Sequence, residues 1–119
     1  MQDVVKAMKA LSDETRLRIL NILLGRECCV YEVMQALDIS QTRASRNLGI
    51  LHDAGFLKMR KEGLWSLYSV DRDGMKEYYP SLVQAVRKSL ENDVLADLDR
   101  KRLKTAERVG PGCVNKCAR

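Results

Sequence analysis

The chain has 119 residues, a length that fits one domain with a modest core. Apolar residues make up 45% of it and aromatic residues only 5%, which favours a mainly helical core of aliphatic side chains. The formal net charge of +5 is compatible with a nucleic-acid partner. No apolar run is long enough to cross a bilayer, and the N-terminus lacks a hydrophobic secretory core. We therefore expect a cytoplasmic protein without a membrane partner.

Two helices are predicted at the start of the chain. Apolar residues recur at helical spacing over residues 2–11, which predicts the first helix. Ser12 is expected to cap the second helix, whose first turn holds the acids Asp13 and Glu14, where they suit the helix dipole. Because the second helix is heavily apolar up to Gly25, where it should end, we expect it to lie in the core.

A helix-turn-helix is predicted next. The extended link Glu27-Cys28-Cys29 leads into a short third helix that ends near Leu37, and only Asp38-Ile39-Ser40 separate it from a fourth helix. Ser40 can cap this fourth helix, and Gly55 supplies the left-handed residue that commonly ends one. Two helices joined by so tight a turn are typical of a helix-turn-helix, with the second as the recognition helix.

The outward face of the fourth helix has the chemistry of a DNA-reading surface. With Ala44, Leu48 and Leu51 facing inward, the outer face carries amide, hydroxyl and guanidinium groups, with two cations and no acid. Such groups suit phosphate oxygens and base edges. From this segment alone, an ordinary amphipathic helix with a solvated basic face is the alternative. The outward residues are Gln41, Thr42, Arg43, Ser45, Arg46 and Gly49.

A β-hairpin is predicted directly behind the recognition helix. Residues 57–60 alternate between apolar and basic, residues 61–63 provide turn chemistry, and residues 64–70 form a second strand. A basic hairpin can straddle a DNA backbone or enter a minor groove, so Arg60 and Lys61 are predicted to contact phosphates. The alternative is a hairpin that covers the core and keeps its charges in water.

A long terminal helix is predicted in the last third of the chain. A helical region is expected from Asp71, and Pro80 interrupts it at a place that best fits a helix start. From there an apolar stripe continues for about five turns, up to Leu98. The domain is too small to cover this stripe, so we expect it to pack against a second copy, although packing on the first helix is the alternative. A twofold homodimer would present two recognition helices to a pseudo-palindromic duplex.

Two units follow from these elements. Residues 1–98 should form a DNA-binding and dimerisation domain, and residues 99–119 a basic extension that contains cysteine. In the extension, Gly110-Pro111-Gly112 breaks any helix ahead of Cys113 and Cys117.

The arrangement of the whole chain resembles the ArsR family of bacterial winged helix-turn-helix metalloregulators. The resemblance covers residues 5–98 and is carried, in order, by residues 10–20, 27–33, 41–48, 51, 54–57 and 60–68. It implies a mainly α fold with a small β-hairpin, dimerised through terminal helices. It also implies a repressor that holds double-stranded operator DNA when free of inducer and releases it when a toxic metal or metalloid binds. Asn47 stands where relatives often carry His; because an amide can still bond to bases, Asn47 joins the predicted DNA contacts.

The resemblance is incomplete at the sensing site. Arsenic-responsive relatives often carry the pattern Cys-Val-Cys-x-x-Cys around the third helix, but here only Cys29 matches, and Tyr31 and Met34 stand at the other two positions. The chain offers four cysteines as candidate ligands instead. Thiolates select soft ions, and trivalent arsenic takes two or three of them. The predicted ligands of a metalloid or soft metal ion are Cys28, Cys29, Cys113 and Cys117.

The resulting hypothesis is a repressor of a metalloid-resistance operon with arsenite or antimonite as its inducer. A redox or persulfide switch on the same cysteines, and a cadmium or lead sensor, are the alternatives. At least one of the first two cysteines could instead be a small buried hydrophobe, and the last two could be incidental thiols of the tail. The only histidine, His52, lies on the recognition helix, so a zinc site on the terminal helix is not expected.

An enzyme is not expected, because the sequence has no nucleophile–base pair, phosphate-binding loop or carboxylate dyad. A protein-interaction module that uses the terminal helix alone is a further alternative, which failure to bind duplex DNA at low salt would favour.

Overall fold

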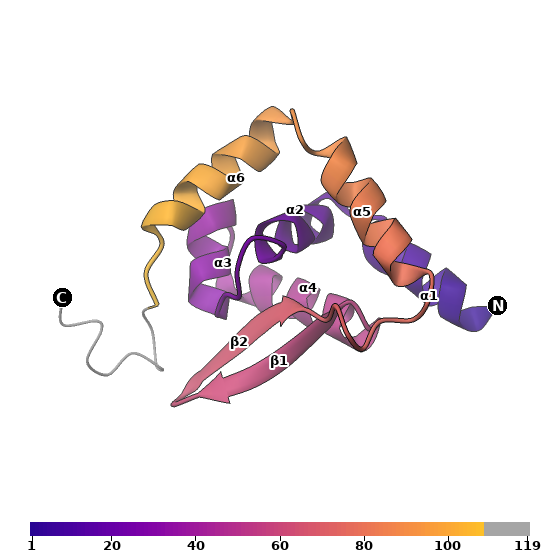
Figure 1. The fold of residues 1–119 in the computed structure, drawn as a ribbon. Coiled ribbons are helices and arrows are strands. Elements are labelled where there is room, and N and C mark those ends of the chain that lie inside the picture. The colour runs from indigo at the N-terminus through magenta and orange to yellow at the C-terminus, as the bar shows by residue number, and fades with distance from the viewer. Residues whose placement is uncertain (109–119) are drawn as a thin grey trace.

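The computed structural model describes residues 1–108, in which six helices and one antiparallel hairpin follow each other along the chain (Figure 1). The helices are α1 (Gln2–Leu11), α2 (Glu14–Leu23), α3 (Val30–Leu37), α4 (Gln41–Asp53), α5 (Tyr79–Ser89) and α6 (Val94–Thr105), and the strands are β1 (Leu57–Glu62) and β2 (Trp65–Val70). The architecture is a winged helix-turn-helix, as predicted. Over the described residues, no helix has both the length and the apolar character of a membrane span.

The helix-turn-helix forms where it was predicted. Asp38 takes a left-handed conformation (φ 56°) at the end of α3, which turns the chain sharply into α4. The side chain of Ser40 accepts the backbone N–H of Arg43 at 3.2 Å and so caps α4. Gly55 lies at φ 94°, a conformation that an L side chain rarely adopts, and ends the α4 segment as expected.

The cap of α2 differs from the prediction. Asp13, not Ser12, is the N-cap, and its carboxylate accepts the backbone N–H of Arg16 at 3.1 Å. The hydroxyl of Ser12 instead donates to the Lys9 carbonyl at the end of α1. A carboxylate at a helix N-terminus also interacts favourably with the helix dipole, which explains the shift by one residue.

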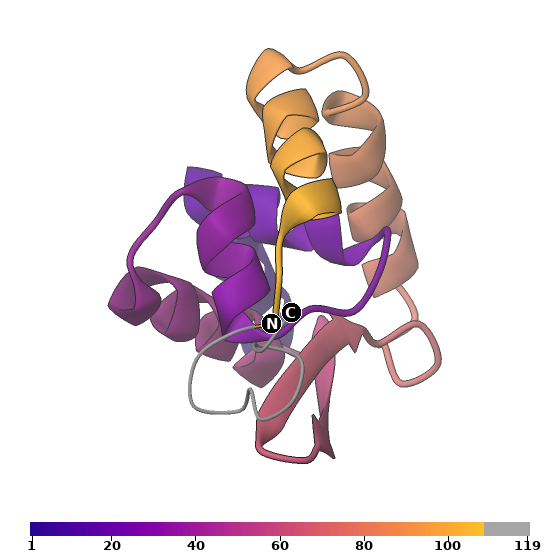
Figure 2. The same ribbon diagram turned by 90° about the vertical axis from the view of Figure 1, so that its left-hand side faces the viewer.

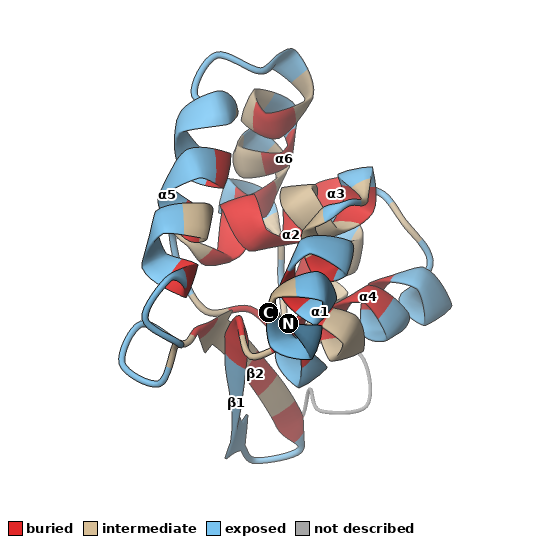
Figure 3. Cartoon of the chain, turned by 90° about the vertical axis from the view of Figure 1, so that its right-hand side faces the viewer, coloured by how far each residue is buried: buried red, intermediate tan, exposed pale blue. Residues whose placement is uncertain are grey.

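The core lies where α2, α3 and α4 meet the base of the hairpin. The inward residues of α4, Ala44, Leu48 and Leu51, are fully buried as predicted. Below them the rings of Phe56 and Tyr79 stack at 4.4 Å, which attaches the start of α5 to the α4–β1 junction. Exposed residues cover the outer faces of β1 and α5 (Figure 3).

The hairpin pairs β1 with β2 in antiparallel register from Leu57–Val70 to Glu62–Trp65. Only Leu57 of β1 is buried, so the strand stands away from the body. The extended link before α3 also joins β2, because Cys28 and Tyr68 exchange two backbone hydrogen bonds of 2.9 and 2.8 Å.

The long terminal helix was predicted wrongly. Residues 71–78 are not helical, and α5 begins at Tyr79 with Pro80 in its first turn. The stripe then breaks into α5 and α6, because Asp93 starts a new helix by accepting the backbone N–H of Ala96 at 2.9 Å. Helix α6 folds back onto α2 and α3 (Figure 1).

The body of the protein extends beyond residue 98, where a boundary was expected. Helix α6 crosses that point without a break, and its Asp99 and Leu103 are buried against the rest of the chain. Asp99 accepts two hydrogen bonds from the guanidinium of Arg18 on α2, at 2.9 and 2.8 Å. Cys113 and Cys117, two of the predicted ligands, lie outside the described residues.

Candidate DNA interface and cysteine site

The N-terminal half of α4 presents a polar and basic surface. The side chains of Gln41, Thr42, Arg43, Ser45 and Arg46 are exposed there, on the side away from the buried Ala44 and Leu48. Within residues 1–108, the side chain of Arg46 has no hydrogen-bond or ion-pair partner in the protein. Its guanidinium is therefore available to phosphates or base edges.

Asn47 lies on the inner side of α4, away from the exposed residues of this helix that are predicted to contact DNA. The residue is only 5% exposed, and both polar atoms of its amide are used inside the protein. Its Oδ1 accepts a hydrogen bond from Arg16 at 2.9 Å, and its Nδ2 donates to the Arg43 carbonyl at 2.9 Å. An amide used in this way helps to position the recognition helix, and the contact of Asn47 with bases stays a prediction.

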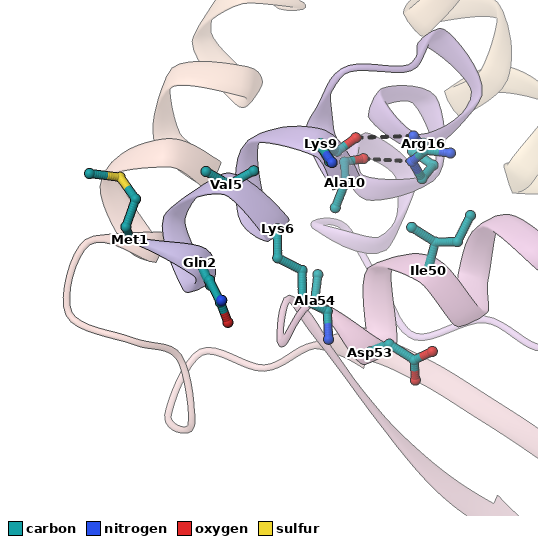
Figure 4. A pocket seen from close by; sticks show the side chains of 10 residues that line it. All are labelled: Met1, Gln2, Val5, Lys6, Lys9, Ala10, Arg16, Ile50, Asp53 and Ala54. Atoms are coloured by element: carbon teal, nitrogen blue, oxygen red, sulfur yellow. Dashed lines mark hydrogen bonds between the residues drawn. The ribbon is translucent and has the colours of Figure 1, made fainter.

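Arg16 connects three helices at this point. Besides Asn47 on α4, it donates to the carbonyls of Ala10 (2.6 Å) and Lys9 (3.1 Å) at the end of α1 (Figure 4). Arg43 adds a second link, since it donates to the Thr15 hydroxyl on α2 at 2.8 Å. These bonds hold the exposed face of α4 in a defined orientation relative to α1 and α2.

The two hairpin residues predicted to contact phosphates, Arg60 and Lys61, are exposed but already have partners. Arg60 pairs with Glu27 at 2.5 Å and with Glu62 at 3.2 Å, and its side chain is 55% exposed. The ammonium of Lys61 donates to the Ser66 hydroxyl at 3.0 Å. A phosphate would have to compete with the two carboxylates for Arg60, whereas Lys61 would exchange only a neutral partner.

Cys28 and Cys29 point to opposite sides of an extended segment. Because side chains alternate along an extended chain, neighbouring thiols face away from each other. Cys28 packs into the main core and donates weakly to the Arg26 carbonyl, with the sulfur 3.7 Å from the oxygen. Cys29 packs instead against Trp65 and Leu67 of the hairpin. The two thiols therefore belong to different environments, and Cys28 has the surroundings of a core residue.

Burial raises the pKa of both thiols above the ordinary cysteine value, because the interior disfavours the thiolate. Neither residue is more than 1% exposed. Both thiols are therefore protonated at neutral pH.

A small cavity lies between Cys29 and the two elements that are predicted to contact DNA. It has a volume of about 250 Å³ and lies between the start of α3, α4 and the hairpin. Cys29, Ser45 of the recognition helix and Trp65 of the hairpin are among the residues that line it. The cavity therefore lies between the two elements expected to contact DNA, beside Cys29.

Glu32 is a functional candidate that the sequence prediction missed. It is 2% exposed, and its carboxylate accepts the backbone N–H of Cys29 at 3.0 Å. It also pairs with the guanidinium groups of Arg26 and Arg108. The spacing from residue 29 to residue 32 is that of a capping box, which was the available signal for this contact. In residues 1–108, no three His, Cys, Asp or Glu side chains are grouped so as to hold a metal ion.

Residues 13–59 match the family model described as bacterial regulatory protein, arsR family. The chain is 42% identical over 76 residues to a cadmium resistance transcriptional regulatory protein CadC homolog of Staphylococcus aureus, a match that covers 63% of each protein. It is 46% identical over 66 residues to the arsenical resistance operon repressor of Escherichia coli K12, which covers 54% of this chain and 56% of that protein. The chain thus spans less than two thirds of the length of these two relatives.

Among solved structures, the fold is similar to the homodimeric winged helix-turn-helix DNA-binding domain of Mb0332 from Mycobacterium bovis, a possible ArsR-family transcriptional regulator. The TM-score is 0.64 at 28% sequence identity, and the match covers 78% of this chain and 82% of that domain. The likeness therefore includes the hairpin as well as the helix-turn-helix.

Proposed function

Because this chain belongs to the ArsR family of bacterial transcriptional regulators, we propose that it represses a metalloid-resistance operon and leaves its operator when arsenite or antimonite binds. Family and fold are those of DNA-binding regulators and not of enzymes. The observation that carries the inducer part is the position of Cys29, which precedes α3 and lines a cavity shared with the recognition helix and the hairpin.

In this proposal the exposed face of α4 enters the major groove. Arg46 and Arg43 donate charge-assisted hydrogen bonds to phosphates or base edges. The neighbouring amide and hydroxyl groups add uncharged hydrogen bonds. The hairpin lies over the flanking backbone, where Arg60 and Lys61 contact phosphates. The proposed DNA contacts are Gln41, Thr42, Arg43, Ser45, Arg46, Arg60 and Lys61.

A twofold homodimer would bring two such faces to a pseudo-palindromic site. The likeness to a homodimeric domain supports it. On α1, Val5 and Met8 are 43% and 49% exposed, although both are apolar, and Val5 borders a groove of about 550 Å³ between α1 and α4 (Figure 4). A large part of the inner side of α6 is covered by its own chain and is therefore not available to a second copy. We propose that the exposed apolar residues of α1 contribute to the dimer contact instead.

The proposed inducer site joins Cys29 to Cys113 and Cys117. Arsenite in neutral water is As(OH)₃, and each thiol that replaces a hydroxide forms an As–S bond while its proton leaves with the hydroxide as water. Arsenic stays trivalent and no net proton is released. A raised thiol pKa therefore imposes no pH penalty on this reaction, unlike the binding of a bare divalent cation, which must displace the protons.

Occupation of Cys29 would weaken DNA binding through local packing. The sulfur is buried against Trp65 and Leu67, so a bound arsenic centre requires the hairpin or the start of α3 to move. Either movement changes the spacing between the hairpin and the face of α4. About 1.4 kcal/mol of coupling lowers DNA affinity tenfold, so a few kcal/mol are enough to lift repression.

The test is release of the reduced protein from a duplex of its own upstream DNA, followed by fluorescence anisotropy during titration with arsenite. We expect arsenite to release the wild-type protein. Cys29→Ala and the double variant Cys113→Ser/Cys117→Ser should bind DNA but stay bound when arsenite is added. Cys28→Ala is the matched control, because its thiol faces the core and should not be needed. Release that none of these variants changes would contradict the proposed site.

Cadmium is the second candidate inducer, favoured by the 42% identity to a cadmium resistance regulator. The same titration with Cd²⁺ distinguishes cadmium from arsenite as the inducer. Cadmium binding to the buried, protonated thiol of Cys29 should tighten as pH rises, whereas arsenite binding should depend little on pH. A persulfide donor is the third titrant; release by it alone would support the redox alternative.

A further inference from the structure

A cavity lies between α2, α5 and α6, away from the DNA-facing side of the molecule. Helices α5 and α6 both pack against α2, and residues 90–93 connect them (Figure 2). The cavity has a volume of about 450 Å³, which is in the range of small-molecule sites. Among the described residues, its lining includes neither Cys29 nor any residue of α4 or the hairpin. It is therefore distinct from the proposed DNA interface and from the proposed inducer site.

Asn21 is a buried polar residue at this cavity. It is the only uncharged polar residue between Leu17 and Leu24, a stretch that otherwise holds apolar side chains and Arg18. Asn21 lines the cavity and is 6% exposed, and its Nδ2 has no hydrogen-bond partner among the described residues. Because buried donors in folded proteins nearly always have a partner, this amide indicates a bound group that accepts a hydrogen bond.

The charged residues that line the cavity, among those the structure describes, are all basic. They are Arg26, Arg87, Arg100 and Lys104. Two of them, Arg26 and Arg100, already pair with carboxylates. Arg87 has only the neutral amide oxygen of Gln84 as a partner, at 3.2 Å, and the side chain of Lys104 has none within residues 1–108. Two cations at the cavity are thus without a carboxylate, which favours an anionic ligand.

The end of α2 does not account for these two cations. The carbonyl end of a helix carries the equivalent of roughly half a negative elementary charge, which favours a nearby cation. That role is already filled, because the guanidinium of Arg72 donates to the Leu24 carbonyl at 3.2 Å from outside the cavity lining. The backbone N–H of Gly25 also donates to the Ile22 carbonyl at 3.1 Å.

Apolar side chains form another part of the wall. Ile22 and Leu103 are 1% and 7% exposed, and both line the cavity together with Leu24. Apolar walls gain free energy from contact with apolar groups, which an inorganic anion does not offer. The wall therefore favours a ligand that has an apolar body as well as a charge.

We propose that this cavity binds a small organic anion with an apolar body, of the class of the alkyl carboxylates. The charged end lies at the basic rim, where Lys104 and Arg87 donate to it. Asn21 Nδ2 donates a further hydrogen bond, and Ile22 and Leu103 contact the apolar body. The site depends neither on the proposed DNA contacts nor on the proposed inducer.

The first experiment titrates the full chain with octanoate and follows the side-chain amide signals by proton–nitrogen NMR. The signal of Asn21 is identified by its loss in Asn21→Leu. We expect octanoate to shift it saturably, with roughly tenfold weaker binding of octanol, which lacks the charge, and of inorganic phosphate, which lacks the apolar body. An Asn21 signal that does not move with octanoate would overturn the proposal and leave water as the partner of this amide. Equally tight binding of octanol or of phosphate would overturn the ligand class.

The second experiment measures octanoate affinity by calorimetry in variants of the cavity. Lys104→Gln should weaken binding roughly tenfold, and because Lys104 is exposed the variant should fold as the wild type does. Asn21→Leu should weaken it as well, while removing a buried donor that has no partner in the described chain. Lys101→Gln is the matched control, since Lys101 is an exposed lysine of α6 outside the cavity lining. Wild-type affinity in both cavity variants would overturn the site.

Discussion

Arg18 and Arg60 are both paired with carboxylates, but the two pairs differ in their access to water. Arg18 makes two hydrogen bonds to Asp99, whose side chain is completely buried between α2 and α6. Arg60 is 55% exposed and is shared between Glu27 and Glu62 on the hairpin side of the molecule.

This difference in access to water decides how much each ion pair contributes to the stability of the fold. Removing one member of a buried pair leaves a charge without a partner in a medium that solvates it poorly, so such a pair is costly to break. An exposed pair gains little, because water competes with each partner and salt screens them. The α2–α6 pair therefore fixes the architecture, whereas Arg60 can exchange its carboxylates for phosphate at low cost.

The largest effect should come from breaking the buried pair. In Asp99→Ala, Arg18 keeps its charge at a site where its side chain is 13% exposed, and we expect a loss of about 3–5 kcal/mol in the free energy of unfolding. Chemical denaturation followed by circular dichroism measures it. Asp97→Ala, which breaks the exposed pair with Arg100 on the same helix, is the control and should cost less than about 1 kcal/mol. Equal losses of stability in the two variants would contradict the distinction between the buried and the exposed ion pair.

On the DNA-facing side, Arg46→Ala should leave stability unchanged but weaken operator binding by about 1–3 kcal/mol, which is roughly tenfold to a hundredfold. The reason is that Arg46 has no partner within residues 1–108 and faces outward. Anisotropy titrations at several salt concentrations measure both the affinity and its salt dependence. Arg87→Ala, an exposed arginine on α5, provides the comparison and should bind as the wild type does.

A smaller effect on DNA binding is expected when a carboxylate that competes with phosphate for Arg60 is removed. Glu27→Gln removes the carboxylate that holds Arg60 at 2.5 Å and also removes a negative charge near the proposed phosphate contact. Binding at low salt should become roughly twofold to fivefold tighter, with the gain lost at high salt. Weaker binding by this variant would mean that Glu27 orients Arg60 toward the phosphate instead of withholding it.

The smallest expected effect is a change in the pKa of Glu27. The hydrogen bond from Arg60 lowers the pKa of Glu27 below its ordinary value of 4.5. Because folding lowers this pKa, the pair stabilises the folded protein at pH values above 4.5. Its contribution is lost as the pH falls through the pKa of Glu27 in the folded state. In Arg60→Ala the pKa of Glu27 should return toward 4.5, which a carbon-detected NMR titration of the carboxyl group resolves. An unchanged pKa would assign the shift to other groups.

Much of the fold was accessible from local patterns. The bounds of α1, the turn at residues 38–40 and the cap at Ser40 depend on residues close in sequence, and the structure confirms them. The terminal helix was mispredicted for the opposite reason: an apolar stripe continues through the break at Asp93, and only the packing of α6 onto α2 and α3 shows that it belongs to two helices.

The sequence by itself determined the winged helix-turn-helix and the polar face of α4, because helix spacing, caps and turn residues act over a few positions. Tertiary structure alone decided that Asn47 turns inward to Arg16, that Cys28 and Cys29 pack on different sides of the chain, and that Arg108 meets Glu32. Each of these outcomes depends on partners more than thirty residues apart, whose approach no local pattern encodes. The surroundings of Cys29 are therefore a property of the folded chain, whereas the polar face of α4 can be predicted from its own residues.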